Sequence, residues 1–372
     1  MTPSTLNTSW VKIFAINVVV FLSGMALAEL SYRVFLTFRS CLSGECDVHW
    51  VSSLKVSDMS EFFGEGIGIS RFDDKLGYVP TEGFDRTVWQ KQVTITSEGF
   101  RKHNVYQNRR RKNVLAIGDS FTFGAEASNQ ETWPACLEEK LGMRVDNAGV
   151  YGYGAAQSLR RAKIILQDKK YYSIILSIVV GDDFYRDTLS YKDGLPKPTL
   201  LNTATGIQWS AVSDPTRKGS KFYEGRSLRF FWFYENFLIA TALGKYLLPT
   251  DLTGMYLTLE HPQAASVPQI IDYTLKTFSN LDTNKKVLVL QYWAPDAYSK
   301  LDTLLSERAE ILTVAKKYDL NVVDTFDILQ NYDEDKVWLR RYSQANNKIV
   351  FSHHSVFGNK LVCESIYNEA FR

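Results

Sequence analysis

The sequence has few of the residues that build metal and cofactor sites. It contains four cysteines and five histidines among 372 residues, and they show no spacing typical of a zinc-ligand set. The glycine-rich run at 149–154 lacks the G-x-G-x-x-G order of dinucleotide-binding loops, and the sequence has no Walker-type phosphate loop. We therefore expect neither a metal ion nor a cofactor.

The chain also carries little excess charge, with a formal net charge of +2. Its one compact basic run, Arg109-Arg110-Arg111-Lys112, has no interleaved aromatic residues and is typical of a solvated lead-in to a strand. Internal repeats and low-complexity segments are lacking as well. Nucleic acid is therefore not an expected partner. The 45% hydrophobic content suits one sizeable globular domain.

A long hydrophobic run does occur near the amino terminus, where residues 13–28 are almost entirely apolar. With the flanking Trp10 and Tyr32, this run approaches the length that spans a bilayer. The alternative is a signal sequence cleaved after Ala28, because Ala26-Leu27-Ala28 resembles a signal-peptidase site. The few nearby positive charges leave the orientation of the segment open.

The cysteines bear on the compartment. Cys41 and Cys46 would close a short loop just beyond the apolar run, which suits a disulfide in an oxidising space, and two reduced thiols are the alternative. Cys136 and Cys363 lie in helical patterns, where we expect small core residues.

The chain divides by composition into three parts. Residues 1–36 form a tail with a transmembrane anchor or signal segment, and residues 37–110 form a leader that we expect to pack on the core or frame the pocket. Residues 111–372 form the main domain, with an insertion at 188–285. The aromatic stretch of the insertion, from Phe230 to Tyr246, fits core packing, a lid, a membrane contact or a surface that stacks on sugar rings.

The most informative stretch is the apolar run at 114–117, which stops abruptly at Gly118-Asp119-Ser120. Its residues suit a parallel strand covered on both faces, and a helical pattern follows at 131–141. Ser120 would then lie at the carboxyl end of a strand. Open α/β sheets bind their ligands there, and free backbone N–H groups at such a turn can stabilise an oxyanion.

Three further blocks accompany Gly-Asp-Ser. A second short strand ends in the glycine-rich turn at 149–154, a third apolar run at 173–180 ends in Gly181-Asp182-Asp183, and His353-His354-Ser355-Val356-Phe357-Gly358 precedes a closing helical pattern. In this order and spacing, over residues 111–187 and 286–372, the four blocks resemble the SGNH hydrolases, also called the GDSL lipase/esterase family. The leader is similar to that of membrane-anchored bacterial members. The resemblance implies an α/β fold, a three-layer sandwich with a central, mostly parallel sheet.

The resemblance also implies roles for single residues. Ser120 matches the nucleophile and His353 matches the general base. The backbone N–H groups of Ser120 and Gly152 match oxyanion donors, and Asp182 lies where the family has an asparagine that donates to the same oxyanion.

Two departures from the family pattern bear on activity. The family has an aspartate shortly before its histidine, whereas this chain has Val350 and Phe351 there, and counting from His354 instead finds no carboxylate either. Two alternatives remain: Ser120 and His353 act as a dyad, or a carboxylate from elsewhere orients His353, with Asp182 and Asp324 as candidates. An ionised Asp182 would also repel the oxyanion, unless burial or the neighbouring Asp183 keeps one of that pair protonated.

The function implied by the resemblance is acyl transfer through a serine ester. We expect an exported serine esterase or O-acyltransferase acting on acyl esters, above all acetyl esters, of cell-envelope glycans. A single helix would hold it in the bacterial cytoplasmic membrane with the main domain outside, and envelope-biosynthesis proteins would be its partners. The competing interpretation is a catalytically degenerate domain that serves as a glycan- or lipid-binding or assembly protein.

Overall fold

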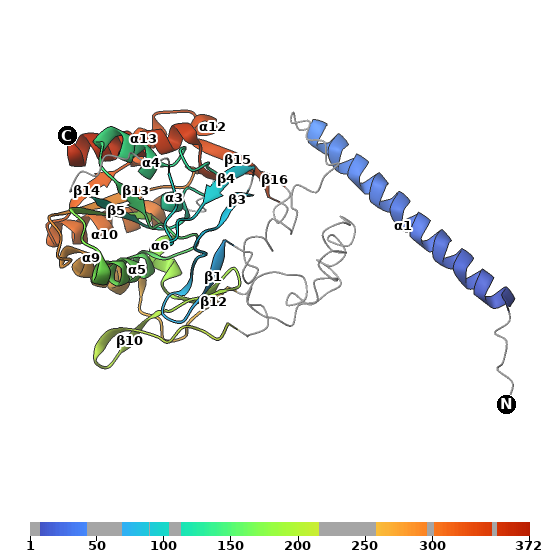
Figure 1. Cartoon of the computed structure of the whole chain (residues 1–372), viewed down its shortest axis with the longest axis horizontal. Coiled ribbons are helices and arrows are strands. Elements are labelled where there is room, and N and C mark those ends of the chain that lie inside the picture. The colour runs from blue at the N-terminus through green and yellow to red at the C-terminus, as the bar shows by residue number, and fades with distance from the viewer. Residues whose placement is uncertain are drawn as a thin grey trace. The chain divides into compact units, whose positions relative to one another are not determined.

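The computed structural model describes residues 8–42, 69–88, 90–103, 113–215, 258–295, 301–343 and 348–372. The chain splits into two compact units. The first contains α1 (Thr8–Leu42), and the second spans Glu61–Phe222 and Tyr256–Arg372 and contains every other described element (Figure 1). The predicted Cys41–Cys46 disulfide and the aromatic stretch from Phe230 to Tyr246 fall outside the residues whose side chains are described.

The helix α1 carries the apolar run identified in the sequence. Its segment Lys12–Tyr32 has 21 residues and a mean hydropathy of 2.1, which is long and apolar enough to cross a membrane. Large side chains along it are exposed, including Phe14 and Phe21. Length and composition make it a candidate membrane span, and a signal sequence would meet the same criterion.

The second unit is built on a five-stranded parallel sheet in the order β14-β13-β7-β5-β6. The strands of this sheet are β5 (Val114–Ile117), β6 (Val145–Asn147), β7 (Ser173–Val179), β13 (Lys285–Gln291) and β14 (Asn321–Asp324). Every residue of β5 and β7 is buried, because helices cover both faces of the sheet. The predicted α/β sandwich is confirmed, and this sheet is wholly parallel.

Helices form a layer on each face of the sheet. Figure 1 shows α4 (Trp133–Leu141) and α13 (Val356–Ile366) together on one side, and α5 (Ala155–Asp168) and α9 (Val267–Ser279) on the other, where α10 (Leu301–Lys317) packs against α9. A π-helical segment, η2 (Tyr367–Phe371), follows α13. Although α9 lies within the predicted insertion at 188–285, its apolar face is part of the main core, so it serves as a crossover helix between β7 and β13.

A disulfide joins the two helices of the first layer. Cys136 of α4 and Cys363 of α13 are bonded, with their Cα atoms 6.1 Å apart. Small core residues were expected at these positions, and Cys363 does lie in the main core, with Cys136 packed against it. Their bond was not predicted, because helices far apart in the sequence pack side by side and only this packing brings the two thiols together.

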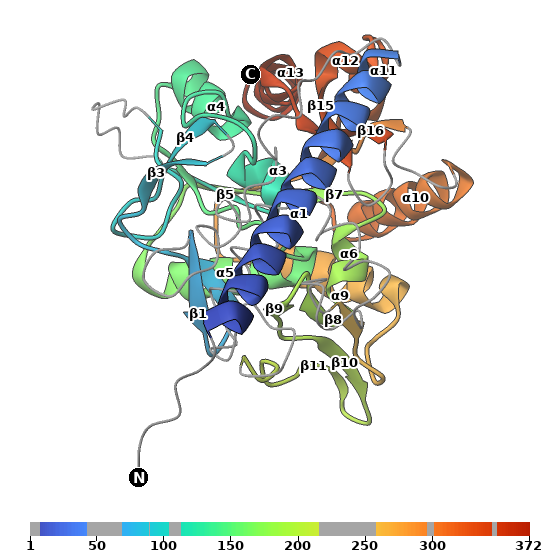
Figure 2. The same ribbon diagram turned by 90° about the vertical axis from the view of Figure 1, so that its right-hand side faces the viewer.

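The leader forms two antiparallel hairpins, β1 (Ser70–Asp73) with β2 (Gly77–Pro80) and β3 (Asp85–Val88) with β4 (Lys91–Thr94). Apolar side chains of these hairpins share a hydrophobic cluster with Phe123. In Figures 1 and 2, β3 and β4 lie close to α3 (Ser120–Phe123). The leader is therefore packed against the turn that follows β5.

The remaining described elements are short. They are α6 (Asp183–Arg186), β8 (Leu189–Lys192), β9 (Leu195–Pro196), β10 (Leu200–Thr203), β11 (Gly206–Trp209), β12 (Leu259–Glu260), α11 (Phe326–Gln330), α12 (Glu334–Val337), β15 (Trp338–Ser343) and β16 (Lys348–His354). Strand β8 pairs with both β9 and β12, β10 pairs with β11, and β15 pairs with β16.

The strand order places the site. The chain passes from β5 to its neighbour β6 on one side and then returns to β7 on the other side of β5. In open parallel sheets, ligands bind beyond the carboxyl ends of the strands at the point where the order reverses. Ser120 follows β5 and Asp182 follows β7, so both lie at this reversal.

Candidate active site

Ser120 lies directly after the tight turn that connects β5 to α3. A Cβ added to Gly118 would lie 2.5 Å from the carbonyl oxygen of Ser177, so only glycine fits at this position. Asp119 caps α3 by accepting a hydrogen bond from the backbone N–H of Phe121 at 2.9 Å. Ser120 thus begins α3 in a buried position at the edge of the sheet.

His353 lies beside Ser120. It comes from the end of β16, and its Nε2 is 2.9 Å from the Ser120 hydroxyl. The pair is 233 residues apart in the chain. The structure therefore brings together the two residues that the sequence resemblance assigned as nucleophile and base, within the distance that proton transfer needs.

The other ring nitrogen of His353 contacts a carboxylate that the sequence analysis missed. Nδ1 lies 2.9 Å from Oε2 of the half-buried Glu126, and the Ser352 hydroxyl donates to the same oxygen. Because a carboxylate only accepts hydrogen bonds, Nδ1 carries the proton and Nε2 is free to accept from Ser120. Ser120, His353 and Glu126 thus form a linear hydrogen-bonded triad.

Neither carboxylate proposed from the sequence takes this position. Asp324 accepts from the hydroxyl of Tyr292 at 2.8 Å and from Nε of Arg308 at 2.7 Å. Glu126 lies just after the nucleophile block, whereas both candidates named from the sequence lie at the carboxyl ends of other strands. The only signal for it was an acidic residue in the loop after Gly124, which is indistinguishable in sequence from a solvated surface glutamate.

Asp182 is part of a buried charge cluster centred on Arg186. Arg186 donates to Asp119 at 2.8 Å, to Asp183 at 2.7 Å and through Nε to Asp182 at 3.0 Å. Nε1 of Trp293 donates to Asp182 as well, at 3.2 Å. Burial raises the pKa of Asp183 well above its usual range, while Arg186 opposes that rise.

This cluster corrects the expected role of Asp182. Its carboxylate accepts hydrogen bonds from Arg186 and Trp293, so it has no proton to donate to an oxyanion. The guanidinium of Arg186 offsets part of the negative charge of the cluster, and burial raises the pKa of Asp183, which favours its protonated form.

The two predicted backbone donors remain available. In the part of the chain that the structure describes, the N–H groups of Ser120 and Gly152 have no hydrogen-bond partner. The peptides on either side of the Gly152 Cα are both held, because the Tyr78 hydroxyl donates to the carbonyl of Tyr151 at 2.8 Å and Nζ of Lys197 donates to the carbonyl of Gly152 at 3.1 Å. Gly152 has φ +73°, which favours glycine.

Aromatic rings surround His353. Its ring centroid lies 5.0 Å from Phe121, 5.2 Å from Trp293 and 6.1 Å from Tyr151. His354, the alternative base considered from the sequence, is fully buried, and burial lowers its pKa to about 3. His354 is therefore neutral and enclosed, whereas His353 contacts the serine.

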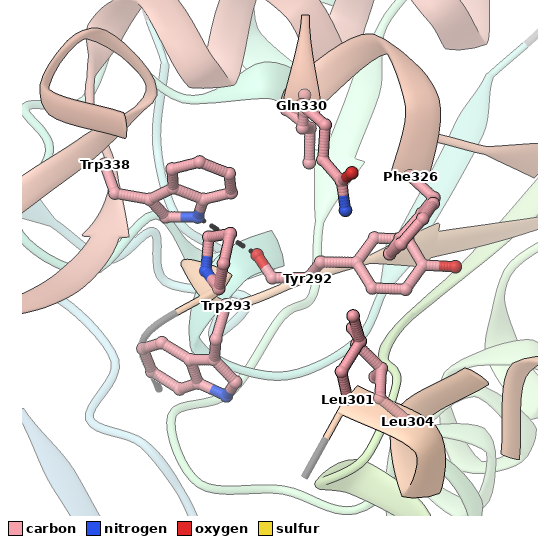
Figure 3. A pocket seen from close by; sticks show the side chains of 9 residues that line it. Tyr292, Trp293, Leu301, Leu304, Phe326, Gln330 and Trp338 are labelled. Carbon is pink, nitrogen blue, oxygen red and sulfur yellow. Dashed lines mark hydrogen bonds between the residues drawn. The ribbon is translucent and has the colours of Figure 1, made fainter. Parts of the chain in front are cut away.

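A shallow cleft opens next to Trp293 (Figure 3). It is lined by Tyr292, Trp293, Pro295, Leu301, Leu304, Phe326, Leu329, Gln330 and Trp338. The polar atoms of its aromatic residues are already used, since Nε1 of Trp338 donates to the Tyr292 carbonyl at 3.1 Å and the Tyr292 hydroxyl donates to Asp324. The cleft therefore offers mainly apolar surface. Among the described residues, no group of three histidine, cysteine or acidic side chains is placed to hold a metal ion.

Comparison with solved structures finds similar proteins at low identity. A member of the lipolytic protein G-D-S-L family from Veillonella parvula is 11% identical over 70% of this chain and 99% of its own, with a TM-score of 0.40. A lipase/acylhydrolase from Enterococcus faecalis is 12% identical over 69% and 94% of the two chains, with a TM-score of 0.38. A catalytic mutant of an acetylxylan esterase from Geobacillus stearothermophilus is 15% identical over 70% and 95%, with a TM-score of 0.35.

Neither a family model nor a curated protein matches the sequence. The four sequence blocks imply a parallel sheet with a serine just after one of its strands. The structure has this arrangement, with the strand order β14-β13-β7-β5-β6 and Ser120 after β5. In its motifs and in its sheet, this chain resembles the SGNH, or GDSL, hydrolases.

Proposed function

We propose that this protein is a serine ester hydrolase or O-acyltransferase. The observation that carries the proposal is the continuous hydrogen-bonded path from the Ser120 hydroxyl through His353 to Glu126, with 2.9 Å at each step. A serine is a weak nucleophile on its own and needs an adjacent base whose orientation a third group fixes. The site supplies all three groups.

The mechanism follows from the atoms present. Ser120 Oγ attacks the ester carbonyl while His353 Nε2 takes the hydroxyl proton, and Glu126 stabilises the resulting imidazolium. The N–H groups of Ser120 and Gly152 stabilise the oxyanion. His353 then protonates the departing alcohol, which leaves an acyl ester on Ser120. Water as the acceptor completes hydrolysis, and a sugar hydroxyl completes transfer.

The compartment and substrate class extend the proposal. We place the second unit outside the bacterial cytoplasmic membrane, with α1 as anchor or, if cleaved after Ala28, as signal sequence. The Cys136–Cys363 disulfide supports this placement, because disulfides persist in oxidising compartments. The acylated glycans of the cell envelope are the substrate class that exported relatives of this kind suggest. The apolar cleft beside Trp293 is a suitable place for the least polar part of such an ester.

The degenerate binding-protein interpretation loses its main support. It rested on the missing carboxylate before His353, and Glu126 occupies that position in space. A domain that only binds ligands does not require a serine, a histidine and a glutamate in hydrogen-bond contact.

The test uses the full chain in detergent. We expect the wild type to hydrolyse short aryl esters and to be labelled covalently by a fluorophosphonate, and Ser120→Ala to do neither. A folded wild type that shows neither activity nor labelling would favour the binding protein and direct the search to glycan ligands.

A further inference from the structure

The loop that carries Glu126 has a backbone conformation that needs support. Glu126 has φ +61°, in the left-handed region that residues other than glycine seldom adopt. Such a conformation costs on the order of 1 kcal/mol and persists only where the surrounding structure holds it. Within the loop itself, the Ala127 N–H donates to the Gly124 carbonyl at 3.2 Å. The N–H of Ala125 donates to the Ser120 carbonyl at 2.9 Å, and bonds from outside the loop add to these local ones.

The outside support is the side chain of Arg101. Its Nη1 donates to the carbonyls of Phe123 at 3.3 Å and Gly124 at 3.2 Å, and its Nη2 donates to the carbonyl of Ala127 at 2.7 Å. These three carbonyls lie on both sides of Glu126 in the chain. One planar guanidinium thus holds both ends of the short segment that presents the carboxylate.

All five N–H donors of Arg101 are used. The other two bonds go to the carbonyl of Gln92 at 3.2 Å and to the side-chain oxygen of Asn129 at 3.0 Å. Arg101 is 2% exposed. A cation buried this deeply is costly unless its donors are satisfied. Here the donors are satisfied by oxygens of the Glu126 loop and of the leader, so the Arg101 side chain links these two segments.

The backbone of Arg101 is itself fixed to the sheet. Its N–H donates to the carbonyl of Asn147, the last residue of β6, at 2.9 Å. The side chain of Asn147 in turn donates to the carbonyl of Thr122 at 2.8 Å, within α3. Arg101 therefore connects the sheet to the loop of Glu126, through its backbone on one side and its side chain on the other.

We infer that Arg101 is a positioning residue, which holds the loop of Glu126 so that the carboxylate stays on Nδ1 of His353. The inference rests on the proposed function and assigns a role to the leader, because Arg101 is a leader residue. Arg101 touches none of the reacting atoms and acts through Glu126.

The first test is a double-mutant cycle on the full chain with para-nitrophenyl acetate. Arg101→Lys keeps the charge and loses the planar fork, and we expect kcat to fall by about 100-fold with KM nearly unchanged. In the Glu126→Gln background the same substitution should change kcat less than about threefold, because the group through which it acts is already lost. Losses that add in full would overturn the inference.

Arg161→Lys is the matched control. Arg161 is also buried and donates to a leader carbonyl, that of Gly99, at 2.8 Å, without contacting the Glu126 loop. Its replacement should leave kcat unchanged. If Arg101→Lys does not fold, Asn129→Ala replaces it in the cycle, since that change removes the oxygen that accepts from Nε of Arg101. Additive behaviour of Asn129→Ala with Glu126→Gln would count against the inference in the same way.

A second measurement does not depend on turnover. In protein with nitrogen-labelled histidine, the Nδ1 proton of His353 should give a low-field resonance, which His353→Ala identifies by its loss. We expect the resonance in the wild type and in Arg161→Lys, and its loss in Glu126→Gln and Arg101→Lys. A resonance that persists in folded Arg101→Lys overturns the inference, whether or not the wild type hydrolyses esters.

Discussion

Nδ1 of His353 donates a hydrogen bond of 2.9 Å to the carboxylate of Glu126, although the two residues are 227 positions apart in the chain. Glu126 belongs to the loop just beyond the nucleophile turn, so the nucleophile and the carboxylate come from neighbouring parts of the sequence. The histidine reaches both from β16. The acid and the base of this site therefore depend on the packing of the carboxyl-terminal strand pair against α3.

The role of Glu126 can be tested by removing its charge. Glu126→Gln keeps the size of the side chain but no longer favours the Nδ1–H tautomer of His353 or stabilises the imidazolium. In the serine-protease template the equivalent change costs about 10⁴-fold in kcat, and we expect a loss of at least about 100-fold here. Steady-state hydrolysis of an aryl acetate measures it.

Asp324→Asn provides the control for this prediction. Asp324 was a candidate for the same role, and it is bonded to Tyr292 and Arg308 instead. Its replacement should leave kcat nearly unchanged while lowering stability. A larger loss of kcat in Asp324→Asn than in Glu126→Gln would show that the acid has been assigned wrongly.

Tyr78→Phe tests how the oxyanion donor of Gly152 is held. The Tyr78 hydroxyl donates to the carbonyl of the Tyr151–Gly152 peptide, whose N–H is the proposed oxyanion donor. Without this bond the peptide can rotate, and we expect kcat to fall roughly tenfold. The matched control is Tyr153→Phe, which removes another buried tyrosine hydroxyl, the one that donates to the Tyr78 carbonyl. Each variant should lose about 1 kcal/mol of stability, and equal kcat values would contradict the prediction.

The Cys136–Cys363 disulfide closes a loop of 227 residues in sequence separation and should stabilise the second unit. Replacing both cysteines by alanine should lower the free energy of unfolding by about 3–5 kcal/mol, chiefly through the unfolded chain. Thermal or urea unfolding with and without reductant measures the effect. Reductant should destabilise the wild type more than the double variant, and an equal response of the two would show that the bond does not form.

His354 should make stability depend on pH. Burial lowers its pKa to about 3 in the folded protein, whereas an unfolded histidine titrates near about 6.5. Between these values the unfolded chain binds a proton that the folded protein does not bind. The free energy of unfolding should therefore fall as the pH is lowered from about 6.5 towards about 3.

The comparison with His354→Phe isolates this contribution. The replacement keeps a ring between Phe121 and Trp338, whose centroids lie 4.8 Å and 6.0 Å from that of His354. Urea unfolding of both proteins between about pH 7 and about pH 5 gives the difference in slope. The variant should show the flatter dependence, and identical slopes would mean that His354 has the same pKa in the folded and unfolded states.

Much of the fold could be predicted because it depends on short-range patterns. The apolar runs at 114–117 and 173–179 became adjacent buried strands, since only parallel strands between two helical layers need apolar side chains on both faces. Ser120 and His353 could likewise be named, because a turn that follows such a strand and a histidine that precedes a closing helix are local features of the sequence.

The sequence alone thus predicted the sheet, the apolar segment of α1 and the serine and histidine that the structure brings together. Tertiary structure alone decided the acid, the partners of Asp182, the Cys136–Cys363 bond and the burial of Arg101. Each of these is a contact between side chains distant in the sequence, and neither periodicity nor composition records such a contact. A glutamate on a left-handed loop looks like any solvated residue until β16 and Arg101 pack around it.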